Sequence, residues 1–161
     1  MKVNPALEAV RDYLDAKKIK YNEAAANTIW FSLLVPTPEI KEMPNRFVSC
    51  GIRVPEKNGL ILYFSATVMA VDVSEEMLAG VASIMMKFQS NEFKAGRIVL
   101  HPDGTIFYTL TQFLCSGGTI DEQAIAALLT TALLEIASIF MVRDESLKNL
   151  PLATVARFGI A

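Results

Sequence analysis

The segment Phe93 to Leu114, FKAGRIVLHPDGTIFYTLTQFL, decides the predicted fold, because it contains two strand-like runs joined by a short turn. Pro102 fixes φ near the value that a type I turn needs, Asp103 can bond a neighbouring backbone group, and Gly104 accepts the positive φ that closes the loop. On both sides of the turn the residues alternate with the period of two that is typical of strands. Since both faces of this hairpin are fairly apolar, we expect the pair to lie inside a sheet.

Composition limits the class of protein. A chain of 161 residues is long enough for one domain with a proper core. We therefore predict a single domain over residues 1–161, in which residues 143–161 form a C-terminal extension of unknown order. Hydrophobic residues make up 52% of the chain and charged residues 20%, below the usual level of about 25%. A monomer would leave much of this apolar surface in water, so we expect a homodimer or another partner.

Charge and targeting signals narrow the choice of partner and compartment. The net charge is −2, and Lys and Arg are scattered apart from a short cluster at Lys17, Lys18 and Lys20. This is not the basic stripe that binds a phosphate backbone, so we expect no nucleic-acid partner. The N-terminal residues lack the apolar core of roughly 7 to 15 residues found in signal peptides. We therefore predict a cytoplasmic protein in which Cys50 and Cys115 are reduced thiols.

The residues before the hairpin predict one helix and three strands. Asn4 can cap a helix that starts at Pro5 and ends near Lys18. The pair Asn58-Gly59 is the preferred chemistry of a tight hairpin turn. Three alternating apolar runs around it predict a meander with the strands Thr28 to Val35, Phe47 to Val54 and Leu60 to Val68.

A second helix is predicted after Ser74, which can cap its positive end. One broad apolar face, assigned to the core, consists of Met77, Val81, Ile84, Met85 and Phe88. A smaller apolar stripe lies roughly opposite and consists of Ala79, Ala82 and Met86. Two interpretations of this stripe stay open: a methionine and two alanines in solvent, or a contact with a second subunit or a partner.

A third helix is predicted over residues 124–142, where Glu135 is the only charged residue. Such a segment approaches the roughly 20 residues that cross a bilayer. However, an apolar side and a polar side can be distinguished, which is typical of the core helix of a soluble protein. We therefore expect no membrane span. The apolar side consists of Ile125, Leu128, Leu129, Ala132, Ile136 and Phe140, and the polar side of Thr130, Thr131, Glu135 and Ser138.

The residues before the third helix are a weak candidate for an anion site. Ser116, Gly117, Gly118 and Thr119 could offer free backbone donors to an anion, but no lysine follows them. The alternative is that they only begin the helix. Thr119 and Glu122 have the spacing of a capping box, in which each side chain bonds the backbone donor of the other residue.

No catalytic motif is present in the sequence, since HExxH, paired CxxC, GxSxG, Walker A and GxGxxG patterns are all absent. The one histidine, His101, stands in the predicted turn, and most of a strand separates it from Cys115. Cys50 is on an apolar strand face, where cysteine is usually a buried small hydrophobe. We therefore predict no catalytic residue, no metal, no cofactor and no enzymatic activity.

The chain resembles the YbjN-like family, a group of candidate bacterial sensory transduction regulators whose fold is similar to that of type III secretion chaperones. The resemblance covers residues 6–142. It rests on the order helix, three strands, helix, two strands, helix, and on turn and cap residues at Asn91, Phe93, Gly96, Asp103-Gly104, Tyr108 and Thr119-x-x-Glu122.

This resemblance implies an α+β fold with an antiparallel five-stranded sheet backed by the first and third helices. It also implies a homodimer, with Ala79, Ala82 and Met86 of the second helix at a possible dimer contact. The resulting prediction is a non-enzymatic, chaperone-like or regulatory domain that holds a polypeptide client by strand addition or groove docking. The alternative is a regulatory module that binds a small ligand between sheet and helix.

Overall fold

The hairpin forms as predicted, and its turn shows the expected chemistry. The His101 N–H bonds the Thr105 carbonyl at 2.8 Å, and the Gly104 N–H bonds the His101 carbonyl at 2.9 Å. Asp103 Oδ1 accepts the Thr105 N–H at 2.8 Å, and Gly104 has a φ of 83°. The computed structural model describes residues 4–23, 27–35, 46–55, 60–70, 74–115 and 117–146. The predicted Asn58-Gly59 turn lies outside these residues, as do residues 147–161.

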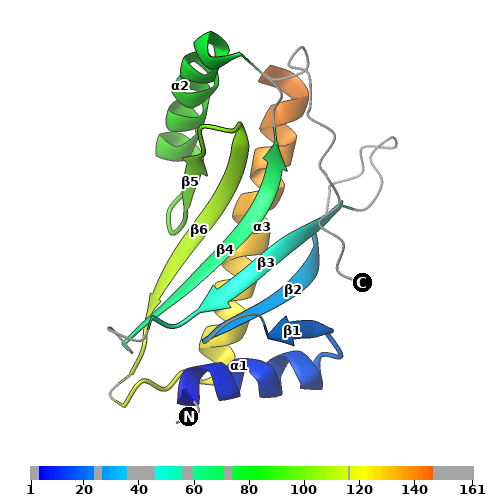
Figure 1. Cartoon of the computed structure of the whole chain (residues 1–161), viewed down its shortest axis with the longest axis vertical. Helices are drawn as coiled ribbons and strands as arrows, with labels where there is room; N and C mark the ends of the chain where they lie inside the picture. Colours follow the sequence, from blue (N-terminus) through cyan, green and yellow to red (C-terminus); the bar gives the residue numbers. More distant parts are fainter. Residues whose placement is uncertain are drawn as a thin grey trace.

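The described chain has an α+β fold with three helices and one antiparallel sheet of six strands (Figure 1). In chain order the elements are α1 Pro5–Ala16, β1 Tyr21–Glu23, β2 Thr28–Val35, β3 Arg46–Arg53, β4 Ile61–Ala70, α2 Glu75–Glu92, β5 Arg97–Leu100, β6 Thr105–Phe113 and α3 Glu122–Ser146. The strand order across the sheet is β1-β2-β3-β4-β6-β5. The predicted meander is therefore confirmed as β2, β3 and β4.

Two details of the predicted sheet are wrong. The sheet has six strands rather than five, because Tyr21–Glu23 adds a short strand to the edge at β2. Its three residues, YNE, are too few and too polar for the alternation of a strand to show in the sequence. The hairpin also does not lie wholly inside the sheet: β6 is internal, but β5 is the edge strand at the opposite end.

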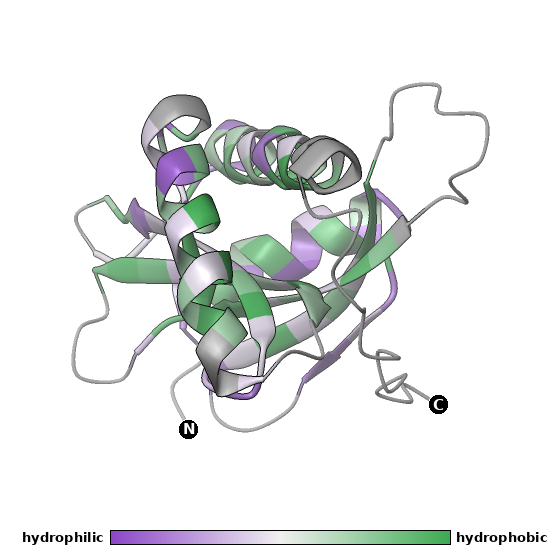
Figure 2. Ribbon diagram, turned by 90° about the horizontal axis from the view of Figure 1, so that it is seen from above, coloured by the Kyte–Doolittle hydropathy of each residue, from purple (hydrophilic) through white to green (hydrophobic). Residues whose placement is uncertain are grey.

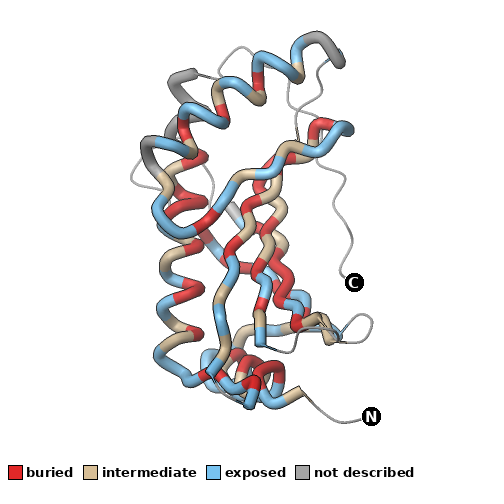
Figure 3. The backbone as a smooth tube through the Cα atoms, turned by 90° about the vertical axis from the view of Figure 1, so that its left-hand side faces the viewer, coloured by how far each residue is buried: buried red, intermediate tan, exposed pale blue. Residues whose placement is uncertain are grey.

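The helices lie on one face and at one end of the sheet. Figure 2 shows that the sheet curves around α1, with α3 on the same side. Figure 3 shows α3 running along one side of the sheet, while α2 crosses its upper end. The inward positions of the strands are buried against these helices, among them Phe31, Phe64 and Tyr108. This inner face confirms the predicted packing of the sheet against the first and third helices.

The N-terminal caps of α1 and α3 agree with the prediction to different degrees. Asn4 caps α1 as expected, because its Oδ1 accepts the Ala6 N–H at 3.0 Å. At α3 the predicted capping box is wrong: Asp121 Oδ1 accepts the Ala124 N–H at 2.7 Å, and the helix begins at Glu122. Thr119 belongs instead to the preceding turn, where its carbonyl accepts the Cys115 N–H at 3.0 Å.

The α2 core face is confirmed only in part. Val81, Met85 and Phe88 are buried, and Ile84 packs partly against the core. Met77 is 45% exposed, so its assignment to the core is wrong. The reason is position: Met77 stands in the first turn of α2, before the part of the helix whose side chains are buried.

The apolar side of α3 is confirmed, since all six residues predicted for it are buried. By length and composition, Glu122–Phe140 is the one span in the described part of the chain that could cross a membrane, and 50% of it is buried inside the fold. The core helix of a soluble protein has the same features. One assignment on α3 is wrong: Glu135, placed on the polar side, is only 9% exposed.

Candidate binding surface

The face of the sheet turned away from α1 and α3 is the main candidate for a functional surface, and we call it the outer face. Inward and outward residues alternate along β2, in which every second residue reaches solvent, and along β4 up to a bulge between Thr67 and Met69. No described helix runs along this side of the sheet (Figure 3). The outer face is therefore a side of the described sheet along which no described helix runs.

Large side chains stand around the margin of the outer face. Phe47 and Phe113 are 72% and 74% exposed, and Trp30, Leu34, Tyr63 and Val99 are exposed to smaller degrees. The strand order brings these residues from five neighbouring strands to one surface, and in the register Leu34 pairs with Phe47 and Val99 pairs with Phe107. Exposed apolar residues gathered in this way are characteristic of interaction surfaces.

Small side chains occupy the middle of the outer face. Two cross-strand rows follow from the register, one through Ser32, Ser49 and Thr67 and one through Gly51, Ser65 and Thr109. These residues are short, so a partner can approach the strands more closely here than at the margin. The outer face thus has a low centre of Ser and Thr inside a margin of large apolar residues.

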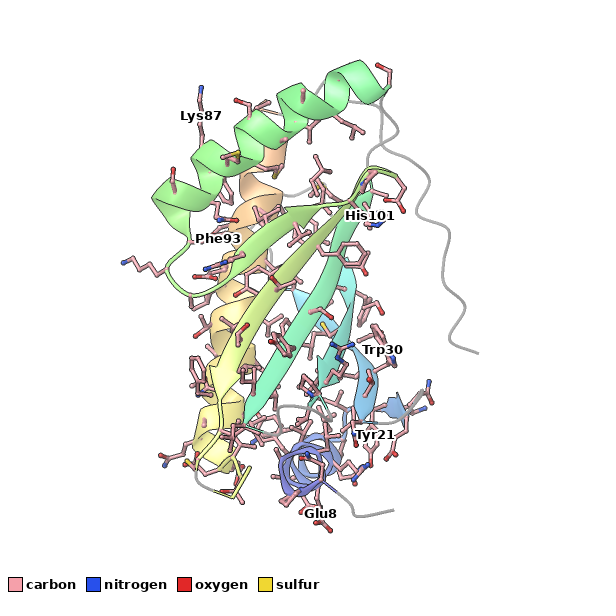
Figure 4. All side chains as sticks on the ribbon, turned by 60° about the vertical axis from the view of Figure 1, so that its left-hand side comes forward. Glu8, Tyr21, Trp30, Lys87, Phe93 and His101 are labelled. Atoms are coloured by element: carbon pink, nitrogen blue, oxygen red, sulfur yellow. The ribbon has the colours of Figure 1, made fainter. Side chains whose placement is uncertain are left out.

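Trp30 is held flat over this centre by the absence of a side chain at Gly51. A Cβ built at Gly51 would lie 2.8 Å from the Trp30 ring, closer than real Cβ contacts. Glycine inside a strand often marks such a close approach. Trp30 is 37% exposed, and Figure 4 shows it on the side of the strands turned away from α3.

The two edges of the sheet are poor sites for strand addition. At β5 the Gln89 side chain from α2 accepts the Ile98 N–H at 2.8 Å, so this edge donor is already bonded within the chain. At the other edge β1 has only three residues, and its Glu23 pairs with Arg11 of α1. Covered and short edges are the usual protection against pairing with a further strand. A partner therefore finds more room on the outer face than at either edge.

The predicted α2 stripe lies on the solvent side of the helix. Met86 is 73% exposed, Ala79 is exposed and Ala82 is partly buried. In the described chain the stripe is separate from the buried face formed by Val81, Met85 and Phe88. A contact with a second subunit remains a prediction.

The predicted anion site is only partly described, because Ser116 lies outside the described residues. Gly117 and Gly118 have φ values of 90° and 73°, and the Gly118 N–H bonds the Cys115 carbonyl at 3.0 Å. Just before the first turn of α3, the Asp121 carboxylate accepts the Ala124 N–H. A carboxylate at a helix N-terminus competes with any anion for the same donors.

The residues considered for catalysis are not brought together. Cys50 is buried in β3, and burial raises the pKa of its thiol to about 12. His101 and Cys115 are exposed near opposite ends of β6, a strand of nine residues and so roughly 30 Å long. Within the described ranges, no three His, Cys, Asp or Glu side chains are grouped so that they could hold a metal ion.

A buried carboxylate cluster is the feature that the sequence did not reveal. Glu135 of α3 accepts the Tyr108 hydroxyl at 2.7 Å and the Gly96 N–H at 2.8 Å through Oε2. Its Oε1 accepts the N–H groups of Lys94 and Ala95 at 2.9 and 3.0 Å. The one signal in the sequence was that Glu135 is the only charge over residues 124–142.

The comparison with known proteins supports the fold described above. A six-stranded antiparallel sheet with helices on one face defines the class as an α+β domain. The fold is similar to the crystal structure of YbjN, a candidate transcription regulator from E. coli, with a TM-score of 0.57 over 95% of this chain and 99% of that chain. The two sequences are 14% identical, so the chain has a YbjN-like fold and the similarity extends no further. No family model and no curated protein matches the sequence.

Proposed function

We propose that the chain is a non-enzymatic regulatory domain of the cytoplasm that binds another polypeptide on the outer face of its sheet. The main support is the exposed apolar margin of that face, with Phe47 and Phe113 at its corners. Removing one such side chain from water contributes about 1.5–3 kcal/mol, so a few of them supply most of the affinity of a complex.

A regulatory role is consistent with the description of YbjN as a candidate transcription regulator. Since the identity is 14%, the proposal depends on the surface of this chain rather than on that description. The chain also lacks a basic stripe, which favours a polypeptide over nucleic acid as the partner.

We also propose that the domain is a homodimer and that the contact is the α2 stripe of Ala79, Ala82 and Met86. Small residues allow two helices to approach closely, and Met86 supplies a flexible apolar side chain that adapts to the facing surface. A dimer through α2 leaves the outer face of each subunit free for a partner.

The alternative, a small-ligand module, has less support in the described structure. The hollow lined by Asp15, Lys18, Ile19, Lys20, Tyr21 and Asn22 is open to solvent. Small-molecule sites are usually concave and largely enclosed.

Capture from native cells tests the proposed function if three tagged forms are compared: the unmodified chain, Phe47→Ser and Leu134→Ser. Leu134 is the matched control, because it is 61% exposed on α3 and therefore not on the sheet. We expect the unmodified chain and Leu134→Ser to retain the same polypeptide in stoichiometric amount, and Phe47→Ser to retain about tenfold less. Equal recovery with all three forms would contradict the proposal.

A further inference from the structure

The outer face carries charge of one sign. Its charged residues in the described strands are Arg53 and Arg97, both exposed, and no described outward position of these strands is Asp or Glu. The chain as a whole has a net charge of −2. Its described carboxylates lie elsewhere, for example on α1, in the hairpin turn and at the start of α3. The outer face is thus a positive, apolar surface on an acidic protein.

A polypeptide that lies flat on the outer face must satisfy its own backbone hydrogen bonds. The faces of a sheet present side chains only, because the strands use their N–H and C=O groups within the sheet plane. An extended segment on this surface would leave its backbone groups to water or without partners. A helix bonds its own backbone, as α3 does on the inner face.

We propose that the partner on the outer face is an amphipathic helix with acidic residues beside its apolar stripe. This inference depends on the proposed function and specifies the chemistry of the partner. The apolar stripe would cover the margin around Trp30 and Phe47, while the carboxylates would meet Arg53 and Arg97. Complementary charge of this kind selects among partners and speeds association.

The dimensions suit such a helix. From β2 to β5 the face crosses four strand spacings, or about 19 Å at about 4.8 Å each. A helix of about 18 residues is roughly 27 Å long and spans this width. The small residues at Ser49, Ser65 and Thr67 lower the centre of the face, which brings the helix closer to the strands.

A second copy of the chain fits the outer face less well. In a two-fold symmetric dimer the same patch occurs on both sides of the contact. Arginine-bearing faces would then oppose each other without a carboxylate between them. The dimer contact that we propose on α2 avoids this arrangement.

The fluorescence of Trp30 reports binding to the outer face directly, because Trp30 is the one tryptophan in the sequence and lies in that face. The probes are three synthetic peptides of about 18 residues without tryptophan. One has an apolar helical stripe flanked by glutamates, the second has the same stripe flanked by lysines, and the third is a scrambled acidic peptide without a stripe. Trp30 emission of the full chain is recorded while each peptide is added.

We expect the acidic amphipathic peptide to shift Trp30 emission to shorter wavelength and to bind about tenfold more tightly than the lysine peptide. The double variant Arg53→Gln with Arg97→Gln removes most of this difference. The matched control, Lys17→Gln with Lys87→Gln, removes the same charge from exposed positions just after α1 and on α2 and keeps the preference.

Three results would overturn the inference. Equal binding of the acidic and lysine peptides would contradict the claim that the partner is acidic, but it would not contradict the proposed function. A lack of any emission change with all peptides would exclude a helix on this face, and the capture experiment would then judge the proposed function separately. A single-stranded oligonucleotide is added as a fourth probe in the same measurement, and tighter binding of it than of the acidic peptide would make the face a nucleic-acid site.

Discussion

At the scale of single residues, Glu135 connects three parts of the fold. Its carboxylate joins α3 to Tyr108 of β6 and to the loop between α2 and β5. Burial by itself raises the pKa of Glu135, but the hydrogen bonds from Tyr108 and from three backbone N–H groups outweigh it, so the pKa lies below its ordinary value. Burial and the hydrogen bond to Glu135 raise the pKa of Tyr108. Glu135 therefore stays ionised at neutral pH and holds the loop against α3.

Replacing this carboxylate tests its structural role. We expect Glu135→Gln to lower the free energy of unfolding by about 1–3 kcal/mol at pH 7, because an amide group cannot accept all four hydrogen bonds. Since the folded pKa is lowered, the contribution is complete above the ordinary pKa of about 4.3 and is lost as pH falls through the folded pKa. Denaturant unfolding at pH 7 and at lower pH measures this. A constant difference between the two proteins at all pH values would contradict the assignment.

Gly96 gives a second test at this scale. A Cβ at this position would lie 2.2 Å from the Tyr108 ring, and the ring is buried, so neither group can move freely. We expect Gly96→Ala to destabilise the fold by about 1–3 kcal/mol in thermal or denaturant unfolding. Gly80→Ala is the matched control, because a Cβ there meets nothing within 4 Å and alanine favours a helix. Equal stability of the two variants would rule out the close contact.

At the scale of elements, the sequence predicts what depends on local pattern. The three helices, the strands from β2 to β6 and the Pro102-Gly104 turn all follow from periodicity and turn chemistry. The misses have two causes. β1 is too short and too polar for an alternating pattern to show, whereas the edge position of β5 and the burial of Glu135 depend on contacts between distant segments. Asp121 displaced Thr119 as the cap of α3 because two left-handed glycines hold Thr119 in a turn.

The α2 stripe leads to a prediction for the assembly. If Ala79, Ala82 and Met86 form the dimer contact, Met86→Asp would bury a charge there and yield a monomer. Light scattering of the two purified proteins at equal concentration measures the mass directly. Lys87→Gln, a neighbouring substitution on the same exposed side of α2, should leave the dimer intact. A dimeric Met86→Asp protein would place the contact elsewhere.

At the scale of the whole molecule, the account depends on the contrast between the two faces of the sheet. The inner face is covered by α1 and α3, whereas the outer face has large apolar residues and no described helix along it (Figure 3). The sequence predicted the alternating strands and an excess of apolar surface, but the surface itself could not be located. Which face of a sheet a helix covers depends on tertiary packing. A shift of one residue in the strand register would also move every side chain of a strand to the opposite face.

Quenching of Trp30 fluorescence by acrylamide tests the central claim most directly, because it asks whether the outer face is open in the isolated chain. Trp30 is 37% exposed, so we expect a quenching constant well above that of a buried indole, unchanged by protein concentration and lowered by a bound partner. A constant typical of a buried indole would show that the outer face is already covered. That result would contradict the claim that the outer face is open. If the quenching constant then rose on dilution of the protein, a second copy of the chain would be what covers the face.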